Sequence, residues 1–432
     1  MTRIRWVALT WIMSSCVLSA FWGFSLMRTS PILMVDFKAY YYGARCLLQH
    51  HDPYDVSELE EVYRTDGGKH PLETIKARQA VTININLPTT LIFVAPFAML
   101  PWGAAHLLWT ILTAGSLIIA AFLVWDLGAN YAPAISGVLI CIVLANTEVF
   151  FAVGNTAGIV VSLCLVAVWC FLKDRFVWAG VLCLAIGLAM KPNDAGLVWL
   201  YFLLAGGIYR KRALQTLLVT AVLGLAAIVW VTPVAPHWMQ ERDSNFVVTS
   251  APGGGNDPGP TADNGRGTRL IIDLQSALAI FRDDPRIYNS VSYLVCGALL
   301  LAWAVRTLRV RFSSTHAWLA LAAVVPITML MTYHRVHDSK LLLLTIPACA
   351  LLWAEGGLIG WLALLVTFAG IVFTGDIALT VLDILTKHLQ ISTAGLSGQM
   401  LTVALMRPTQ LTLLAMSIFY LWIYLRRETE RS

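Results

Sequence analysis

The chain has 432 residues, of which 58% are hydrophobic and only 13% are charged, and its net charge is +5. Soluble proteins carry about 25% charged residues. The composition and a mean hydropathy of +0.71 therefore exclude a soluble enzyme, a disordered chain and a nucleic-acid-binding module. They predict an all-α, polytopic membrane protein, and at about 20 residues a span the chain has room for about a dozen helices.

The first apolar run covers residues 6–27 and follows Arg3 and Arg5. It is longer than the roughly 7–15 apolar residues of a signal peptide, and no clear A-x-A cleavage site follows it. We expect residues 6–27 to form an uncleaved first transmembrane helix with a cytoplasmic N-terminus.

A polar segment, residues 28–87, comes next and is predicted to lie outside the cytoplasm. Large side chains recur at helical spacing within residues 36–49. This pattern predicts an amphipathic juxtamembrane helix that lies on the membrane. Residues 51–55 (HDPYD) indicate a turn after it.

The rest of the chain alternates between apolar runs and short polar joints. The runs are roughly residues 88–101, 103–125, 134–149, 155–172, 177–190, 195–208, 215–233, 288–305, 315–332, 339–354, 359–383 and 409–425. Together with residues 6–27 they predict about 12–13 membrane segments in a single domain of residues 1–432. Its central helices occupy 88–233 and its C-terminal helices 288–425, and a Gly/Pro-rich outer loop, 234–287, separates them. Whether the short run 88–101, with its three prolines, spans the membrane stays open.

The placement of charge gives the orientation. Basic residues gather at the joints 173–175, 209–212, 306–311 and 425–427, which the positive-inside rule places in the cytoplasm. Several polar clusters then fall on the opposite face: residues 36–41, 84–86, 148–155, 191–194, 273–276 and 333–338. Their convergence on one face predicts a functional site there.

Asp36 is the first candidate for chemistry. A carboxylate at the membrane boundary acts as a general base when partial desolvation tunes its proton affinity. The alternative is an N-cap for the helix that follows, since Asp is a preferred capping residue. The two roles are compatible.

A second group of candidates suits an anionic ligand. Lys191 is placed to hold a phosphate as a point charge, or else it snorkels beside the helix-breaking Pro192. His334, Arg335 and His337 suit an anionic leaving group, with Arg giving forked contacts to phosphate oxygens. If this segment is helical, the two histidines at i, i+3 would suit a metal, but no third ligand is apparent. The alternative without a function is a solvated joint between two helices. Asn155 and Gln275 suit sugar hydroxyls or phosphate, or they cross-link helices.

Taken together, these segments resemble a known family. Residues 36–45 (DFKAYYYGAR) followed by 51–54 (HDPY) look like the opening signature of glycosyltransferase family 87, whose members are GT-C integral-membrane enzymes that use polyprenyl-phosphate sugars. Further elements follow in the same order over about residues 30–355: 86–101, 154–155, 188–192, 274–276 and 333–334. The chain departs from the family pattern after Gly154, where a Gln is replaced, and before Gln275, where an Asn is replaced.

The resemblance implies a GT-C helical bundle in a bacterial plasma membrane, with its active site facing the periplasm or exterior. It implies transfer of a hexose, with mannose favoured, from a polyprenyl-phosphate sugar to a glycolipid or glycan acceptor in one inverting displacement. The role of base falls to Asp36. The expected substrate and phosphate contacts are Lys191, His334, Arg335, His337, Tyr40, Tyr41, Asn155 and Gln275. We expect no cofactor, although a divalent metal stays open, and no nucleic-acid partner.

Two other functions compete with an enzyme. A secondary transporter or lipid flippase would explain the helices, but transporters more often keep ionisable residues inside their spans. Most spans here are free of charge, and the long polar first loop is left unexplained. A non-catalytic assembly protein would not require the ordered polar clusters.

Overall fold

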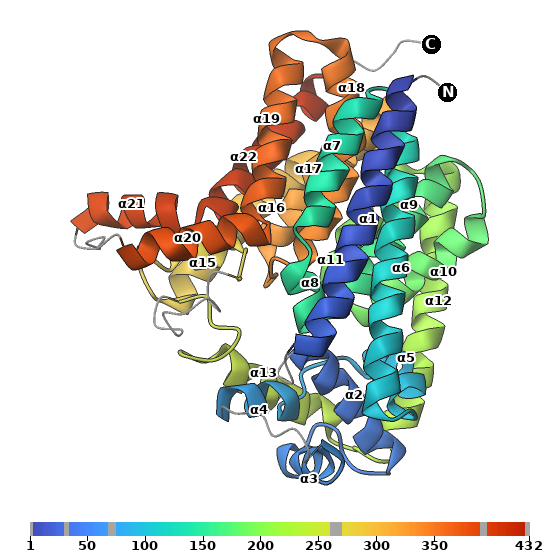
Figure 1. Cartoon of the computed structure of the whole chain (residues 1–432), viewed down its shortest axis with the longest axis vertical. Helices are drawn as coiled ribbons and strands as arrows, with labels where there is room; N and C mark the ends of the chain where they lie inside the picture. Colours follow the sequence, from blue (N-terminus) through green and yellow to red (C-terminus); the bar gives the residue numbers. More distant parts are fainter. Residues whose placement is uncertain (1–2, 30–33, 68–74, 260–269, 389–394, 428–432) are drawn as a thin grey trace.

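The computed structural model describes residues 3–29, 34–67, 75–259, 270–388 and 395–427 (Figure 1). Helices make up 81% of the described residues. Among the described residues the only β-pairing is an isolated bridge between Ile271 and Arg335. The predicted all-α fold is confirmed.

The N-terminal half of the fold runs from α1 to α12. Its helices are α1 (Arg3–Thr29), α2 (Val35–Leu48), α3 (Val56–Gly67), α4 (Ile75–Thr82), α5 (Pro88–Ala98), α6 (Trp102–Gly128), α7 (Pro133–Ala145), α8 (Glu148–Val153), α9 (Ala157–Leu172), α10 (Val177–Met190), α11 (Pro192–Ala205) and α12 (Gly207–Val231).

The C-terminal half follows. It contains α13 (Trp238–Ser250), α15 (Leu274–Leu278), α16 (Pro285–Arg309), α17 (Ser314–Met331), the 3-10 helix η1 (Asp338–Thr345), α18 (Ile346–Glu355), α19 (Gly357–Phe373), α20 (Asp376–His388), α21 (Gly395–Met406) and α22 (Pro408–Arg426). Proline stands in the first turn of many of these helices, where its missing N–H costs no hydrogen bond, as in α11 and α22.

Six described helices are long and apolar enough to cross a membrane alone: α1, α6, α12, α16, α17 and α22. The pair α19 and α20, bent by 69° at its break, gives a possible seventh span. Other expected segments are shorter apolar helices, among them α7, α9 and α10. An additional apolar helix, α21, occupies a region expected to be a joint. The chain is a multi-pass membrane protein.

The basic joints meet at one end of the bundle. The buried Arg212 side chain donates to the Phe171 carbonyl oxygen at 2.8 Å and pairs with Asp174. At the last helix, Arg427 forms a forked pair with Glu355, with N···O distances of 2.8 and 2.5 Å. Both termini lie at this same end (Figure 1). The joints predicted to be cytoplasmic therefore share one side.

The length of the helix that residues 88–101 form shows whether this run can span the membrane. The run forms α5, a helix of 11 residues with Pro96 inside it. At 1.5 Å a residue it is about 16 Å long, roughly half the thickness of the hydrocarbon core. It packs against α2 at the lower end of the bundle (Figure 1). This run therefore does not cross a bilayer by itself.

The helix predicted for residues 36–49 is confirmed as α2, but its surroundings differ from the expectation. It is covered by α3, α4 and α5, and most of its side chains are buried. Phe37 stacks on Trp109 of α6 with ring centroids 4.6 Å apart. Because aromatic side chains lie on several sides of α2, they are buried by packing on neighbouring helices rather than by lying on lipid.

The break between α19 and α20 is held by reciprocal caps with α8. The Asp376 carboxylate accepts hydrogen bonds from the backbone N–H of Glu148 at 2.7 Å and of Val149 at 3.3 Å. In return the Asn146 side-chain oxygen accepts from the Ile377 N–H at 3.2 Å. Each helix start thereby satisfies the other's unpaired donors.

Two glycines test the packing of the shorter apolar helices. A Cβ on Gly180 would lie 2.8 Å from Cys170 and Phe171 side-chain atoms, whereas one on Gly196 would meet nothing within 4 Å. We expect Gly180→Ala to destabilise the protein by about 1–3 kcal/mol through overpacking. The matched Gly196→Ala should be neutral or stabilising, because Ala favours helix over Gly by about 0.5–1 kcal/mol. Melting temperatures in detergent measure both, and equal shifts would contradict the tight contact between α9 and α10.

Candidate active site

Three helix junctions bring polar side chains together in the bundle. The Asp36 carboxylate on α2 accepts a hydrogen bond from the Asn155 amide nitrogen at 2.7 Å. The Asn155 side-chain oxygen lies 3.4 Å from the Lys191 ammonium at the junction of α10 and α11. The amide thus links the predicted base to a predicted phosphate-binding cation. Asp36 and Asn155 are 119 positions apart in the sequence, and Asn155 and Lys191 are 36 apart.

Asp36 does not cap its own helix. The N-cap of α2 is Met34, with φ of 63° and no side-chain capping bond, and its N–H donates to the Ala152 carbonyl at 2.5 Å. The capping alternative is therefore wrong. The carboxylate instead faces Asn155 and stays partly exposed.

Gly154 allows Asn155 to approach α2. Its φ is +66°, and a Cβ there would lie 2.9 Å from the Phe37 Cβ. Its carbonyl oxygen accepts a hydrogen bond from the Trp109 indole at 3.0 Å. A side chain at this position would have to push α2 away from the α8–α9 junction.

Lys191 points inward rather than snorkelling to the membrane surface. Its ammonium lies 3.3 Å from the Asp194 carboxylate and forms an ion pair with Asp338, and both carboxylates are buried. Burial alone would lower the pKa of Lys191, but the two carboxylates outweigh it and raise that pKa above its ordinary value. Lys191 is therefore held as a cation.

His334 is buried in the joint between α17 and η1. Its Nδ1 lies 2.9 Å from the Thr332 carbonyl oxygen, which only accepts, and its Nε2 lies 3.1 Å from the Asp194 carboxylate. Burial opposes the charged form, but Asp194 outweighs it and raises the pKa of His334. This geometry favours the imidazolium, which donates from both nitrogens.

The joint around His334 is neither helical nor an open solvated loop. His337 is also buried, and desolvation lowers its pKa to about 3 despite the Asp338 carboxylate 3.4 Å away. The neutral His337 thus differs from the cationic His334. Because residues 333–337 are not helical, the i, i+3 arrangement considered for a metal does not form.

Arg335 ties the outer loop to this joint. Its backbone pairs with Ile271 and its N–H donates to Asp338 at 2.7 Å. Its guanidinium donates to the Tyr333 hydroxyl and, at 2.6 Å, to the Gly255 carbonyl oxygen. The Gly/Pro-rich segment is thereby held against the polar junctions.

The remaining predicted residues differ in whether they contact the polar cluster. The Tyr40 hydroxyl accepts from the Asn155 amide at 3.0 Å and so lies in the cluster. The Tyr41 hydroxyl instead donates to the Leu100 carbonyl at 2.7 Å, beyond the end of α5. Gln275 donates to the Met331 carbonyl at 3.1 Å, at the end of α17 that precedes the His334 joint.

Burial sets the acid–base character of Asp36. Desolvation raises its pKa, while the Arg335 charge and the Asn155 hydrogen bond partly counter this. A carboxylate whose proton affinity is raised by burial is a stronger base than one in water, and it still ionises beside cations. The arrangement places such a base beside a cationic group of residues.

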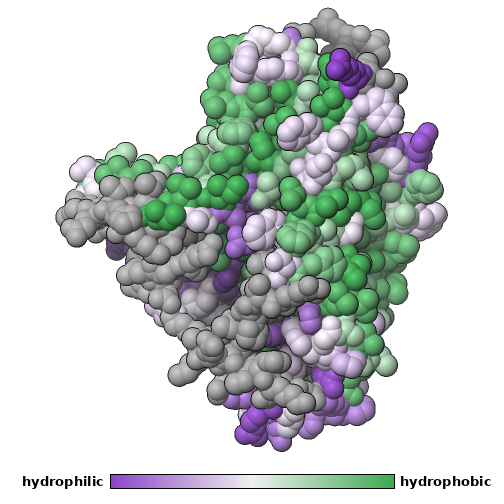
Figure 2. Space-filling model, viewed as in Figure 1, coloured by the Kyte–Doolittle hydropathy of each residue, from purple (hydrophilic) through white to green (hydrophobic). Residues whose placement is uncertain are grey.

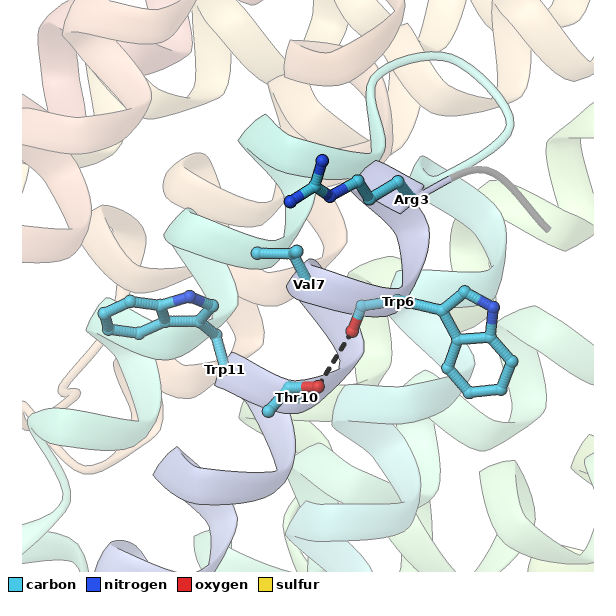
Figure 3. A pocket seen from close by; sticks show the side chains of 5 residues that line it. All are labelled: Arg3, Trp6, Val7, Thr10 and Trp11. Atoms are coloured by element: carbon cyan, nitrogen blue, oxygen red, sulfur yellow. Dashed lines mark hydrogen bonds between the residues drawn. The ribbon is translucent and has the colours of Figure 1, made fainter.

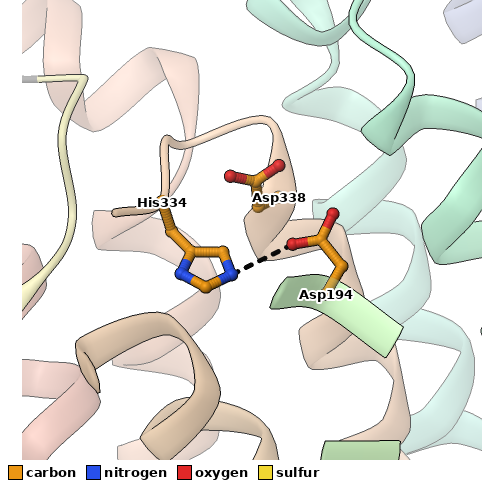
Figure 4. Close-up of side chains that lie close together, drawn as sticks. All are labelled: Asp194, His334 and Asp338. Atoms are coloured by element: carbon orange, nitrogen blue, oxygen red, sulfur yellow. Dashed lines mark ion pairs between the residues drawn. The ribbon is translucent and has the colours of Figure 1, made fainter. Parts of the chain in front are cut away.

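Two carboxylates and a histidine lie close enough together to bind one metal ion. One ligand atom each from Asp194, His334 and Asp338 lies within 4.8 Å of the others (Figure 4). The Lys191 ammonium already contacts both carboxylates. A divalent cation at this position would have to compete with that ammonium.

Two hollows along α1 lie away from this cluster. A groove of about 620 Å³ runs between α1 and α7 and is lined mostly by apolar side chains. It and an adjoining hollow share Arg3, Val7 and Trp11 (Figure 3). These residues lie near the start of the 27-residue α1, which is about 40 Å long, whereas Asp36 follows its other end. The grooves are therefore lipid-facing features remote from the polar cluster.

Asp194 and Asp338 were given no individual role from the sequence, although both belonged to the predicted polar clusters. They are the carboxylates that hold Lys191 and His334 in place. The i, i+3 spacing of Lys191 and Asp194 was the available signal, because such a pair shares one side of a helix start. The contact with Asp338, 147 positions away, had no local signal.

Comparison with known proteins supports the family resemblance. Residues 85–247 match the model of glycosyltransferase family 87. The predicted resemblance is thereby confirmed for this part of the chain. The match indicates a membrane glycosyltransferase. No curated protein and no solved structure matches the chain significantly. The family match includes Asn155, Lys191 and Asp194, while Asp36 and His334 lie outside it.

The Lys191–Asp338 pair can be tested by a double-mutant cycle. We expect Lys191→Met to lower stability by about 3–5 kcal/mol, because it leaves buried carboxylates without their cation. Adding Asp338→Asn should recover part of this loss, since it removes one of the stranded charges. Thermal unfolding in detergent gives the stability of the wild type, the two single variants and the double variant. Strictly additive effects would contradict a direct pairing.

Proposed function

We propose that this protein is a family 87 enzyme that transfers a hexose, specifically mannose, from a polyprenyl-phosphate sugar to an extracytoplasmic glycolipid or glycan acceptor. The reaction is a single inverting displacement. The choice of mannose and of a polyprenyl-phosphate donor rests on the resemblance of the sequence motifs to the family. The residue roles rest on the geometry described above.

One observation carries the proposal. A partly exposed carboxylate, Asp36, is joined through a single amide, Asn155, to the Lys191 ammonium. Glycosyl transfer from a lipid phosphate needs a base for the incoming hydroxyl and positive charge for the departing phosphate. The two requirements meet within one hydrogen-bonded chain.

The proposed chemistry begins at Asp36. Its carboxylate takes the proton of the acceptor hydroxyl as that oxygen bonds to the anomeric carbon of the sugar. The bond between this carbon and the phosphate oxygen breaks, and its electron pair leaves with the lipid phosphate. Because attack and departure occur on opposite faces of the sugar, the anomeric configuration inverts.

Three cations are proposed to stabilise the departing phosphate. Lys191 and His334 are positioned by buried carboxylates, so their charges are fixed before substrate binds, which is the arrangement that lowers a barrier most effectively. Arg335 adds a forked donor that also contacts the outer loop. Neutral His337 lies behind them as a supporting residue. Tyr40, Asn155 and Gln275 complete the proposed substrate contacts, and Tyr41 supports α2.

The proposed location is a bacterial plasma membrane with the active site facing the periplasm. The basic joints and both termini share one end of the bundle, and the positive-inside rule assigns that end to the cytoplasm. The cap that α2 to α5 form lies at the other end (Figure 1). The donor tail would remain in the bilayer while its phosphate meets the polar junctions.

Replacing Asp36 tests the role of the base. We expect Asp36→Asn to reduce sugar transfer by about 10²–10⁴-fold, because a positioned general base contributes that much to the rate. Asp55→Asn is the matched control, since Asp55 is partly exposed and only caps α3, accepting from the Ser57 and Glu58 N–H groups. Membranes are incubated with labelled polyprenyl-phosphate mannose, and the product is identified by mass spectrometry.

The outcomes separate the parts of the proposal. Full activity of a normally expressed Asp36→Asn protein would eliminate Asp36 as the base. Absence of transfer from this donor by the wild-type protein would contradict the choice of donor sugar. Transfer from a different polyprenyl-phosphate sugar would correct the sugar and leave the mechanism in place.

A further inference from the structure

Lys340, a buried lysine two residues after Asp338 in the sequence, takes no part in the cluster. Lys340 on η1 is only 4% exposed. Within the described part of the chain it makes no hydrogen bond and no ion pair, and the Asp376 carboxylate acts on it only at longer range. An ionisable side chain buried in a membrane bundle without a close partner is costly, and such residues are functional candidates by default.

Asp376 is not available to neutralise this lysine in direct contact. Its two carboxylate oxygens accept from the Glu148 and Val149 N–H groups and so cap α8. Lys191, by contrast, touches two carboxylates. Lys191 and Lys340 therefore differ: Lys191 is paired within the protein, whereas Lys340 has no direct partner among the described residues, and an external anion would supply one.

The position of Lys340 connects it to the active site. It stands two residues after Asp338, which binds Lys191. The α8 helix that Asp376 caps leads directly to Gly154 and Asn155. Beneath α20, Figure 2 shows hydrophilic side chains beside the apolar surface of the bundle. A lipid head group can contact polar groups at such a boundary while its tail stays among apolar surfaces.

We propose that Lys340 binds the phosphate of a polyprenyl lipid substrate, as a further binding residue beside the Lys191 and His334 cluster. This inference rests on the proposed function, because it assumes a phosphate-bearing lipid. The shared chemistry is a phosphate oxygen facing a buried ammonium. A charge-assisted contact of this kind, formed where water is excluded, stabilises the complex and neutralises the lysine.

The test measures lipid binding without catalysis. The purified full-length protein in detergent is titrated with undecaprenyl phosphate, undecaprenol, phosphatidylglycerol or inorganic phosphate, and the melting temperature is followed. We expect undecaprenyl phosphate to raise the melting temperature of the wild-type protein and undecaprenol to have little effect. Lys340→Met should weaken the apparent affinity by about ten- to a hundredfold, as loss of a charged hydrogen bond does. Lys340→Arg should retain most of the affinity.

The ligand-free melting temperature provides a second readout. Because the buried amine has no direct partner without lipid, Lys340→Met should melt no lower than the wild type. A lysine with a structural partner would give the opposite sign. Lys173→Met, which removes a lysine paired with Asp126 at 3.1 Å, is the control and should keep the full response to lipid.

Several results would overturn this inference. These are an unchanged affinity for undecaprenyl phosphate in Lys340→Met, a lower melting temperature or failure of that variant to fold without lipid, and an equal response of the wild type to phosphatidylglycerol or inorganic phosphate. Each leaves the proposed function standing, since that is judged by sugar transfer in wild-type membranes. Loss of transfer in the wild type, with lipid binding through Lys340 retained, would instead contradict the proposed function alone.

Discussion

The pairing of Lys191 with Asp194 and Asp338 is the interaction on which the polar centre depends. An isolated charge in an apolar bundle costs several kcal/mol, so buried charges are stabilised when they neutralise one another. Here the lysine stands at the break between α10 and α11, and its partners come from α11 and η1. Asp194 also pairs with His334, so the same buried carboxylate holds both cations. The helix breaks supply the charged groups, and their mutual neutralisation fixes how the breaks face one another.

Much of this arrangement was predictable because local sequence rules govern it. Apolar runs predicted the helices, Arg212 and Arg427 predicted the cytoplasmic end, and Asp36, Lys191 and His334 were recognisable as costly charges near the bilayer. The pairing of Lys191 with Asp338 was not predictable, since it depends on how distant helix breaks pack. The burial of α2 was missed for the same reason: amphipathic spacing describes a helix on lipid and a helix under other helices equally well.

The structure gives different surroundings to neighbouring residues that the sequence did not distinguish. His334 and His337 belong to one short motif, yet a carboxylate holds the first as a cation, while burial keeps the second neutral. Tyr40 and Tyr41 are neighbours, yet only Tyr40 reaches Asn155. Tyr40 therefore faces the polar cluster and Tyr41 supports packing, whereas both histidines lie beside carboxylates of the cluster and differ in charge. Distinct roles for adjacent, chemically similar residues arise from the helix face or joint on which each side chain lies.

The proposed base and the proposed phosphate-binding cations imply a single displacement, and the stereochemistry of the product tests this most directly. The measurement is the anomeric configuration of the transferred sugar, determined by NMR on the product of the wild-type enzyme and compared with that of the donor. The account predicts inversion, because Asp36 activates the acceptor and forms no bond to the sugar. Retention would contradict it, since two successive displacements through a covalent intermediate would then be required.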